Sequence, residues 1–255
     1  MVVSSFSASG KLYFHQRHSL FLHYAYDIRL TPSAWFGVTP EPIARRIAAD
    51  IPSHLGSTPS KDTIVDLFAG AGGNTIAFAL AEKWARIIAI EKDPATLACA
   101  QHNAAVYGVS ECITWVLGDS MEYLSRLRRA RLEGKPPEEV GVDDRLWLDP
   151  ARTVLFASPP WGGVGYREQE VFDLEGMQPY GLRMLHGMCW EMEHVLYLPR
   201  TSDLRQIAAL VGDGEDRKIE CVQYCMDGAS KALVAYIPAE RGDQDQDGGG
   251  GRSDE

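Results

Sequence analysis

The sequence has 255 residues, of which 45% are hydrophobic, enough for one large domain with a complete core. Its formal net charge of −10 excludes a broad, non-specific basic grip on nucleic acid, but it leaves open the recognition of a single nucleotide or a short RNA end. The five cysteines form no Cys-x-x-Cys pair and no zinc-finger spacing, and no apolar stretch reaches transmembrane length, so we expect a soluble intracellular protein with reduced thiols.

The first 55 residues differ in composition from the rest of the chain. Residues 1–10 are rich in serine and weakly patterned, so we expect a flexible N-terminus. Residues 11–30 mix aromatic with basic side chains, which favours either a short amphipathic helix packed on a larger domain or a surface that stacks on a base and binds phosphate. Thr39 is a good N-cap for a helix over 41–50, with Pro40 just inside its start. We therefore predict a helical N-terminal arm over residues 11–55.

From residue 56 the sequence alternates between short apolar runs and helical stretches. The runs expected to form strands are 63–68, 86–90 and 113–117, and the expected helices are 75–83 and 94–107. Strands that alternate with helices form βαβ units, which place the strands in a parallel sheet. In an open sheet of this kind, ligands bind at the carboxyl ends of the strands.

Residues 121–150 interrupt this alternation and are interpreted as an insertion. A helix over 121–132 is expected to precede a loop rich in proline, glycine and acidic residues over 134–144. Four arginines lie towards the end of that helix: Arg126, Arg128, Arg129 and Arg131. We interpret them as a solvated helix face, with RNA contact as the alternative.

The remaining elements complete a sheet of seven strands. After a strand over 154–157, the expected elements are a helix over 181–193, a strand over 194–198, a helix from Ser202 or Asp203 to Leu210, and a hairpin of 218–224 with 231–237. The hairpin turns near Asp227 and Gly228. We therefore predict a single mostly parallel α/β domain over 56–239, with an antiparallel C-terminal hairpin and a disordered, acidic, glycine-rich tail over 240–255.

Polar groups at the ends of the first three strands predict a cofactor site. Asp66 begins the spacing Asp-x-x-x-Gly-x-Gly-Gly, without the Gly-Lys-Ser/Thr of a nucleotide P-loop. A carboxylate there suits a cationic ligand such as S-adenosylmethionine (AdoMet) and repels a pyrophosphate. Glu91 can accept hydrogen bonds from two ribose hydroxyls, and Asp119 from an adenine amino group. Each acid alone is an ordinary strand end and the loop alone a structural turn, but in this order they predict AdoMet binding.

The run 158–163, of sequence SPPWGG, is the most distinctive stretch of the chain. Two prolines end the preceding strand, and two glycines allow a sharp turn or a close backbone approach. We expect a rigid corner that presents the Ser158 hydroxyl, the Pro159 carbonyl and the Trp161 indole. The two acceptors can orient an exocyclic amine for methyl transfer while the indole stacks on its ring. The alternative is a proline corner with a core tryptophan.

Three stretches together resemble the trimethylguanosine synthases, a family of class I AdoMet-dependent methyltransferases that act on N2 of an RNA cap guanine. They are 35–41 (WFGVTPE), 66–75 (DLFAGAGGNT) and 158–163 (SPPWGG). The stretches from Asn103 to Gly108 and from Leu198 to Arg200 also resemble the family, and the likeness runs from about Lys11 to Ile237. It implies a Rossmann-like methyltransferase fold and conversion of a 7-methylguanosine cap to its 2,2,7-trimethyl form.

The resemblance also implies roles for individual residues. The residues implied to bind AdoMet are Phe21, Thr39, Asp66, Gly70, Gly72, Glu91, Asp119 and Ser158. Ser158 and Pro159 would hold the guanine amine, Trp161 would stack on the cationic base, and Arg200 with Lys11 would meet the cap phosphates. The implied partners are capped small nuclear and nucleolar RNAs and their ribonucleoproteins. A monomer without a metal is expected in the nucleus, with the nucleolus and the cytoplasm as further locations.

The sequence departs from the family pattern in places. Ala25, Tyr26 and Asp27 stand where an acidic run is usual, Glu91 where Asp is common, and the insertion is longer than expected. The alternatives left open are a class I methyltransferase for another RNA guanine N2 or for a protein amide, and a cap-binding module without activity. The presence of Asp66, Glu91 and Ser158 argues against the module.

Overall fold

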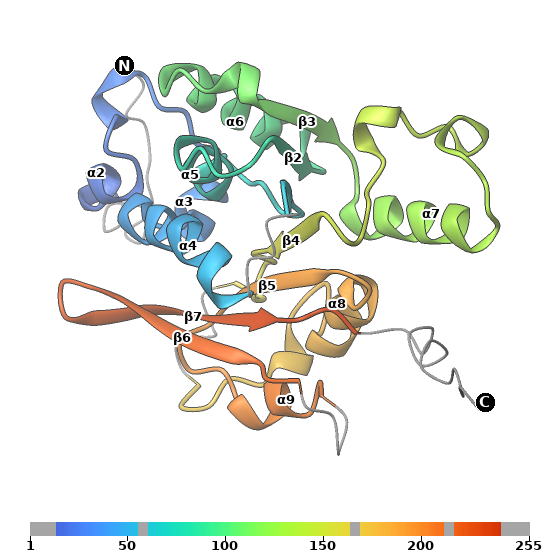
Figure 1. Cartoon of the computed structure of the whole chain (residues 1–255). Coiled ribbons are helices and arrows are strands. Elements are labelled where there is room, and N and C mark those ends of the chain that lie inside the picture. The colour runs from blue at the N-terminus through green and yellow to red at the C-terminus, as the bar shows by residue number, and fades with distance from the viewer. Residues whose placement is uncertain (1–13, 56–60, 164–168, 212–216, 241–255) are drawn as a thin grey trace, which may run out of the picture.

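The computed structural model describes residues 14–55, 61–163, 169–211 and 217–240, so predictions for residues 1–10, Lys11 and the tail beyond 240 lie outside the described residues. Its centre is a seven-stranded sheet of order β3-β2-β1-β4-β5-β7-β6 (Figure 1). The strands are β1 (Thr63–Asp66), β2 (Arg86–Glu91), β3 (Ile113–Leu117), β4 (Thr153–Ala157), β5 (Glu193–Leu198), β6 (Glu220–Met226) and β7 (Ala229–Ile237). The first five are parallel, and β7 is antiparallel to β5 and β6. The predicted α/β fold with an antiparallel C-terminal hairpin is confirmed.

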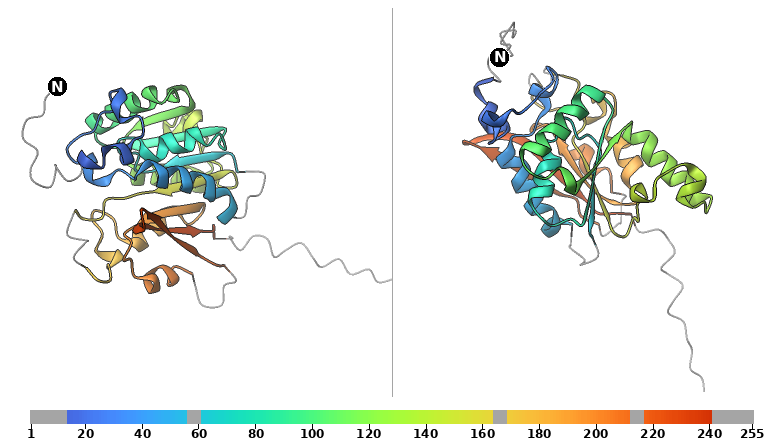
Figure 2. Two further views of the ribbon diagram at one scale, coloured as in Figure 1. Left: turned by 90° about the vertical axis from the view of Figure 1, so that its left-hand side faces the viewer. Right: turned by 90° about the horizontal axis from the view of Figure 1, so that it is seen from above.

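Helices cover both faces of the sheet (Figures 1 and 2). The α-helices are α2 (Arg17–Leu20), α3 (Ala34–Gly37), α4 (Glu41–His54), α5 (Gly73–Leu80), α6 (Pro94–Val106), α7 (Ser120–Leu132), α8 (Leu182–Cys189) and α9 (Leu204–Ala208). The side chains of β4 show why there are two cores, because alternate residues of a strand point to opposite faces. Val154 and Phe156 belong to the core under α4 and α5, and Leu155 and Ala157 to the core under α7 and α8.

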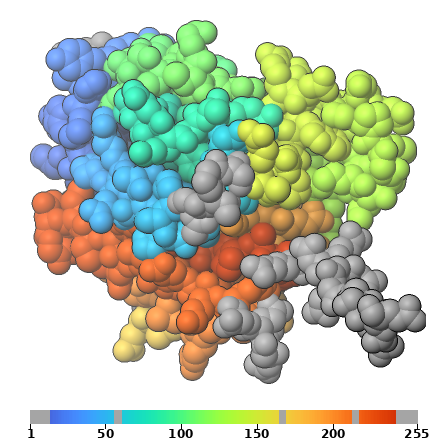
Figure 3. Space-filling view, in the orientation of Figure 1, coloured from blue at the N-terminus to red at the C-terminus, as the bar shows by residue number. Residues whose placement is uncertain are grey.

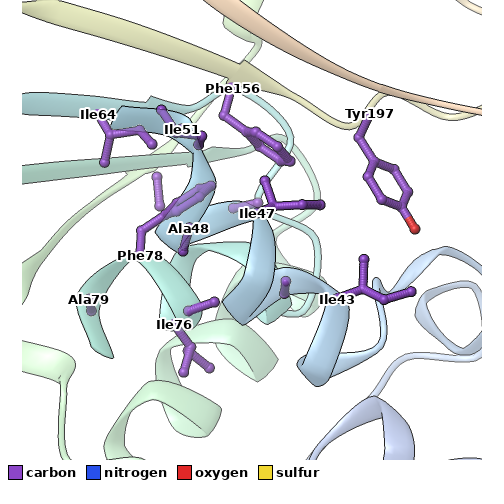
Figure 4. Packing of buried hydrophobic residues seen from close by; sticks show 14 of the residues in the cluster. Ile43, Ile47, Ala48, Ile51, Ile64, Ile76, Phe78, Ala79, Phe156 and Tyr197 are labelled. Atoms are coloured by element: carbon purple, nitrogen blue, oxygen red, sulfur yellow. The ribbon is translucent and has the colours of Figure 1, made fainter. Parts of the chain in front are cut away.

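Helix α4 fastens the N-terminal part of the chain to the sheet. Ile43, Ile47 and Ile51 recur at helical spacing and are at most 3% exposed. They pack among the residues of β1, α5 and β4 (Figure 4). Burying each of these side chains stabilises the fold by about 1.5–3 kcal/mol, so α4 is a part of the domain and not a detached arm.

The start of α4 differs from the prediction. Thr39 is not the N-cap, because Pro40 occupies that position without a side-chain cap, and the Thr39 hydroxyl accepts a hydrogen bond from Asn74 Nδ2 at 3.1 Å. Proline in the first turn is tolerated because its missing N–H has no helical partner there.

The segment before α3, residues 14–30, is called the arm below. It contains α2, which is four residues long, and a 3₁₀ turn (Tyr24–Tyr26); Phe14 and His15, at the start of the described residues, are also helical. The arm contributes Leu20, Phe21 and Ile28 to the hydrophobic core. Polar contacts add to this: Leu22 N donates to the buried Glu41 carboxylate at 2.6 Å, and Arg29 N donates to Asn103 Oδ1 at 2.8 Å.

The insertion forms a flank on the side of the molecule opposite to the arm (Figures 2 and 3). Its arginines do not form one solvated face, which corrects the prediction. Arg128 and Arg131 pair with Glu191, and Arg126 pairs with Glu122 on the same helix. Within the described ranges, no helix is both long and apolar enough to cross a membrane.

Other boundaries moved by a few residues. The helix expected over 181–193 ends at Cys189, because Met192 N bonds to Cys189 O in a turn and Glu193 already starts β5. Asp203 caps α9 by accepting from Arg205 N. The β6–β7 hairpin turns at Asp227 and Gly228, both with positive φ, as a two-residue hairpin turn requires.

Candidate active site

The carboxyl ends of β1 and β4 lie side by side at the point where the strand order reverses. From β1 the chain runs outwards to β2 and β3, and it then returns to β4 and β5 on the other side. Asp66 at the end of β1 is in register with Phe156, two residues before Ser158. Such a reversal opens a crevice beyond the strand ends, where ligands bind in α/β sheets. The glycine loop and the proline corner therefore face the same crevice.

The glycine loop, residues 69–73, connects β1 to α5. Gly70 and Gly72 have φ of +53° and +91°, which side chains rarely adopt. A Cβ on Gly73 would lie 3.2 Å from Val38 Cγ1, so the segment leading into α4 runs directly against the loop. Thr39 lies in that segment and binds Asn74, the residue after the loop.

Asp66 is fully buried below this loop. Its Oδ2 accepts from the Thr75 hydroxyl at 2.6 Å and its Oδ1 from Phe68 N at 3.3 Å. Burial raises the pKa of the Asp66 carboxyl to about 7; the two hydrogen bonds lower it, and the charge of Glu91 raises it further. Asp66 is thus poised to ionise when a positive charge arrives.

Glu91 and Asp119 follow the next two strands. Glu91 Oε2 accepts from Gly70 N at 3.0 Å, which ties the end of β2 to the glycine loop. Asp119 caps α7 through Oδ1, which accepts from the backbone N–H groups of Met121 and Glu122 at 2.9 and 3.1 Å. Burial raises the pKa of Asp119, but its hydrogen bonds outweigh burial and leave the pKa below its ordinary value. Three carboxylates therefore line the ends of β1, β2 and β3.

The proline corner, Ser158–Gly163, leaves β4 on the other side of the crevice. Ser158 is half-buried, and neither its hydroxyl nor the Pro159 carbonyl is hydrogen-bonded to any residue in the described ranges. Both acceptors are therefore available to a ligand. Gly162 and Gly163 have φ of +85° and +89°, the left-handed region expected for a sharp turn at glycine.

The Trp161 indole is held by β5. It stacks on the Tyr197 ring with centroids 5.6 Å apart and an interplanar angle of 18°, and its Nε1 donates to Tyr197 O at 3.3 Å. Tyr197 is 4% exposed, on the α4 side of the sheet (Figure 4). Trp161 itself is half-buried, as a stacking platform requires, so the indole has a fixed support and is not wholly a core residue.

Of the three remaining predicted residues, the structure describes Arg200 and Phe21 and not Lys11. Arg200 follows β5, three residues beyond Tyr197, and its exposed guanidinium forms no ion pair with the described part of the chain. Phe21, by contrast, is 1% exposed and packs against Tyr107, so it supports the arm from inside and does not project from it. Lys11 lies outside the described residues.

The sequence analysis assigned no role to two residues that contact the site, Asn103 and Tyr180. Asn103 is fully buried; besides accepting from Arg29 N, its Nδ2 donates to Arg29 O and to Ala71 O, both at 2.9 Å. It thereby joins the arm to the glycine loop. Asn103 stands in a stretch that resembles the family, which is a signal for importance but not for this contact. Tyr180, which contacts Asp119, has no comparable signal.

The residues present fit AdoMet as a ligand. The three carboxylates suit its ammonium, ribose and adenine donors, and the glycine loop allows a close backbone approach. Asn74 Oδ1 is buried and accepts no hydrogen bond within the described segments, so an acceptor is left over beside the loop. In the same segments, no three His, Cys, Asp or Glu side chains come together as a metal site.

Comparisons with known proteins agree with this geometry. A family model described as RNA cap guanine-N2 methyltransferase matches residues 61–240. The trimethylguanosine synthase of Schizosaccharomyces pombe is 30% identical over 230 residues, covering 89% of this chain and 85% of that protein. The trimethylguanosine synthase of Saccharomyces cerevisiae is 31% identical over 206 residues, covering 78% of this chain and 58% of that protein.

Solved structures show the same fold at low identity. A methyltransferase from Porphyromonas gingivalis W83 has a TM-score of 0.61 at 16% identity, covering 90% of this chain and 48% of that one. The METTL16 methyltransferase domain has a TM-score of 0.55 at 14% identity, covering 90% and 96%. These two likenesses concern the fold alone.

Proposed function

The chain belongs to the RNA cap guanine-N2 methyltransferase family, and from that premise we propose that it methylates N2 of the 7-methylguanosine cap of small RNAs with AdoMet, giving the 2,2,7-trimethylguanosine cap. One observation carries the proposal: the proline corner with its supported Trp161 follows β4, and β4 pairs with β1, which ends at Asp66 and leads into the glycine loop. Donor and acceptor sites are thus neighbours across the crevice.

When bound, AdoMet supplies an electrophilic methyl group on a sulfonium centre. The amine of a guanine is a weak nucleophile, because its lone pair is delocalised into the ring, so the protein must orient it. Ser158 Oγ and Pro159 O accept the N–H bonds of that amine, and both are unengaged in the described residues. Orientation of this kind is the proximity and electrostatic work that lowers such barriers.

Trp161 and Arg200 recognise the rest of the cap. A 7-methylguanine ring is a cation, and stacking on an indole is strengthened by that charge. The Tyr197 ring behind Trp161 already fixes the indole, so little conformational entropy is lost when the cap base stacks on it. Arg200 meets the phosphates with the charge-assisted hydrogen bonds that its planar group favours.

The natural setting is part of the proposal. Small nuclear and nucleolar RNAs and their ribonucleoproteins are the expected partners, and a monomer in the nucleus, without a metal ion, is the expected form. These expectations rest on the family resemblance. Activity that persists in EDTA would support a reaction without a metal, and loss that Mg²⁺ restores would contradict it.

A transfer assay tests the proposal. The protein is incubated with methyl-labelled AdoMet and either 7-methyl-GTP or GTP, and labelled product is separated by chromatography. Transfer to 7-methyl-GTP alone is expected, with a doubly methylated product at long times. Transfer to GTP but not to 7-methyl-GTP would favour another guanine-N2 substrate, and tight 7-methyl-GTP binding without transfer would favour a cap-binding module.

A further inference from the structure

Tyr180 comes after the proline corner in the sequence and contacts Asp119 of the proposed cofactor site. It stands two residues before α8, with the N-cap Gly181 between them. Its hydroxyl donates to Asp119 Oδ2 at 2.9 Å, although 61 residues separate the two in sequence. Its ring lies 6.0 Å from the Phe68 ring, at the end of β1. Tyr180 therefore spans the strand ends from β1 to β3.

The hydrogen bond from Tyr180 goes to Asp119 Oδ2, the carboxylate oxygen that does not cap α7. Oδ1 is committed to the first turn of α7, where it accepts two backbone N–H groups. The helix start is fixed in turn, because the Ser120 hydroxyl donates to Leu67 O. Oδ2 is thus the oxygen that can face a ligand, and the Tyr180 hydroxyl is its donor in the structure. A carboxylate oxygen accepts more than one hydrogen bond, so the phenol and an adenine amine can bind together.

Tyr180 is held in place by the residues around it. A Cβ on Gly181 would lie 3.0 Å from Glu175 O, so the backbone at Gly181, next to Tyr180, runs close to the backbone at Glu175. The Glu175 carboxylate accepts from Arg183 N at 3.2 Å, which closes the same turn from the other side. The phenol therefore projects from a braced position, and its orientation does not depend on Asp119 alone.

We infer that Tyr180 is a positioning residue of the cofactor site, which aims Asp119 Oδ2 at the adenine amino group and closes that end of the site from the substrate side. The inference rests on the proposed function, since it takes Asp119 as the adenine acceptor. Through this hydrogen bond, the chain that follows the proline corner contacts the proposed cofactor site directly.

Tyr180→Phe tests the inference, because it keeps the ring on Phe68 and removes only the hydroxyl. The affinity for S-adenosylhomocysteine (AdoHcy), measured by calorimetry, should fall about three- to tenfold, the worth of one ordinary hydrogen bond. The affinity for 7-methyl-GTP, measured at saturating AdoHcy, should stay within about twofold. Tyr123→Phe is the matched control. The Tyr123 hydroxyl also donates a hydrogen bond, to Leu146 O in the insertion, and removing that hydroxyl should leave AdoHcy affinity unchanged.

A double-mutant cycle separates positioning from packing. Asp119→Asn keeps an oxygen for the helix cap and turns an N–H₂ group towards the phenol, which can accept from it, but the adenine amine then has no acceptor at this position for Tyr180 to aim. Adding Tyr180→Phe to Asp119→Asn should then change AdoHcy affinity by less than about twofold. An effect as large as in the wild type would overturn the inference, as would a Tyr180→Phe enzyme with unchanged affinity. Wild-type protein that does not bind AdoHcy, or Asp119→Asn without effect, would instead overturn the proposed cofactor site itself.

Discussion

Replacing Asp66 with asparagine should make cofactor binding insensitive to pH between about 5 and 7. In the free protein, burial raises the pKa of Asp66 to about 7, so the carboxyl holds its proton through most of this range. The proposed partner of Asp66 is the ammonium group of AdoMet. An opposite charge close to a carboxyl lowers its pKa, so binding should expel the proton.

The size of the effect follows from the shift. If the bound cofactor returns the pKa from about 7 to its ordinary range, binding at pH 6 releases close to one proton, about 0.9 by the titration of the free carboxyl. The dissociation constant should then rise about tenfold for each pH unit below 7. AdoHcy is the ligand of choice, because it keeps the ammonium group and does not react.

Calorimetry at pH 6 in buffers of different ionisation enthalpy counts the released protons. The wild type should release close to one, and Asp66→Asn should release none. Asp144→Asn is the control, because Asp144 is exposed in the insertion, and its release should equal that of the wild type. Tight AdoHcy binding by the wild type with no proton release would refute the pairing of Asp66 with the ammonium group.

The same shift predicts how the free protein responds to pH. The unfolded chain loses the Asp66 proton near pH 4 and the folded chain near pH 7, so the contribution of Asp66 to stability is full below about pH 4 and is lost as pH rises to 7. The difference is on the order of 4 kcal/mol. Denaturant unfolding should show Asp66→Asn gaining stability relative to the wild type as pH rises from about 4 to 7; a constant difference over this range would contradict the raised pKa.

Three further substitutions test other parts of the site. Trp161→Ala should abolish methyl transfer with little loss of AdoHcy affinity; an equal loss of both would mark the indole as structural. Arg200→Ala should raise KM for 7-methyl-GTP several-fold, and the increase should shrink with added salt, as an exposed ionic contact requires. Asn103→Ala should lower the free energy of unfolding by about 2–4 kcal/mol, because three backbone groups lose their partner, whereas the exposed Gln101→Ala on the same helix should stay within about 0.5 kcal/mol.

The strands were predictable because their signal is local. Apolar runs and alternation gave β3 its exact range and the other strands to within a few residues. The start of α4 was not, because Thr39 has the residue type of a cap and yet its hydroxyl is engaged by Asn74, 35 positions away. Likewise, the arginines of α7 look like a solvated face until Glu191 is placed beside two of them. Contacts between distant residues decided these cases.

In the site, too, local signals predicted some residues, and contacts between distant residues had to be seen in the structure. Residue types at strand ends predicted Asp66, Glu91 and Asp119, because parallel strands bring their carboxyl ends to one edge. Periodicity could not show that Asp66 is sealed beneath its loop or that Phe21 points inwards. The contacts of Asn103 and Tyr180 were equally invisible, since each joins segments that no local rule relates.

The order of the strands explains how an acidic protein can bind a phosphate-rich cap. Along the edge, the sheet presents Asp119, Glu91 and Asp66 on β3, β2 and β1, then the proline corner on β4 and Arg200 on β5. Neighbouring strands are about 4.8 Å apart, so the acids and the arginine are separated by up to four spacings, about 19 Å. The carboxylates would attract a cationic cofactor and repel a triphosphate, which leaves the β5 side for the phosphates in the proposed function. The acceptor amine would then lie over β4, one strand from the proposed cofactor site at β1, because β4 is the strand between Asp66 and Arg200 in the sheet order.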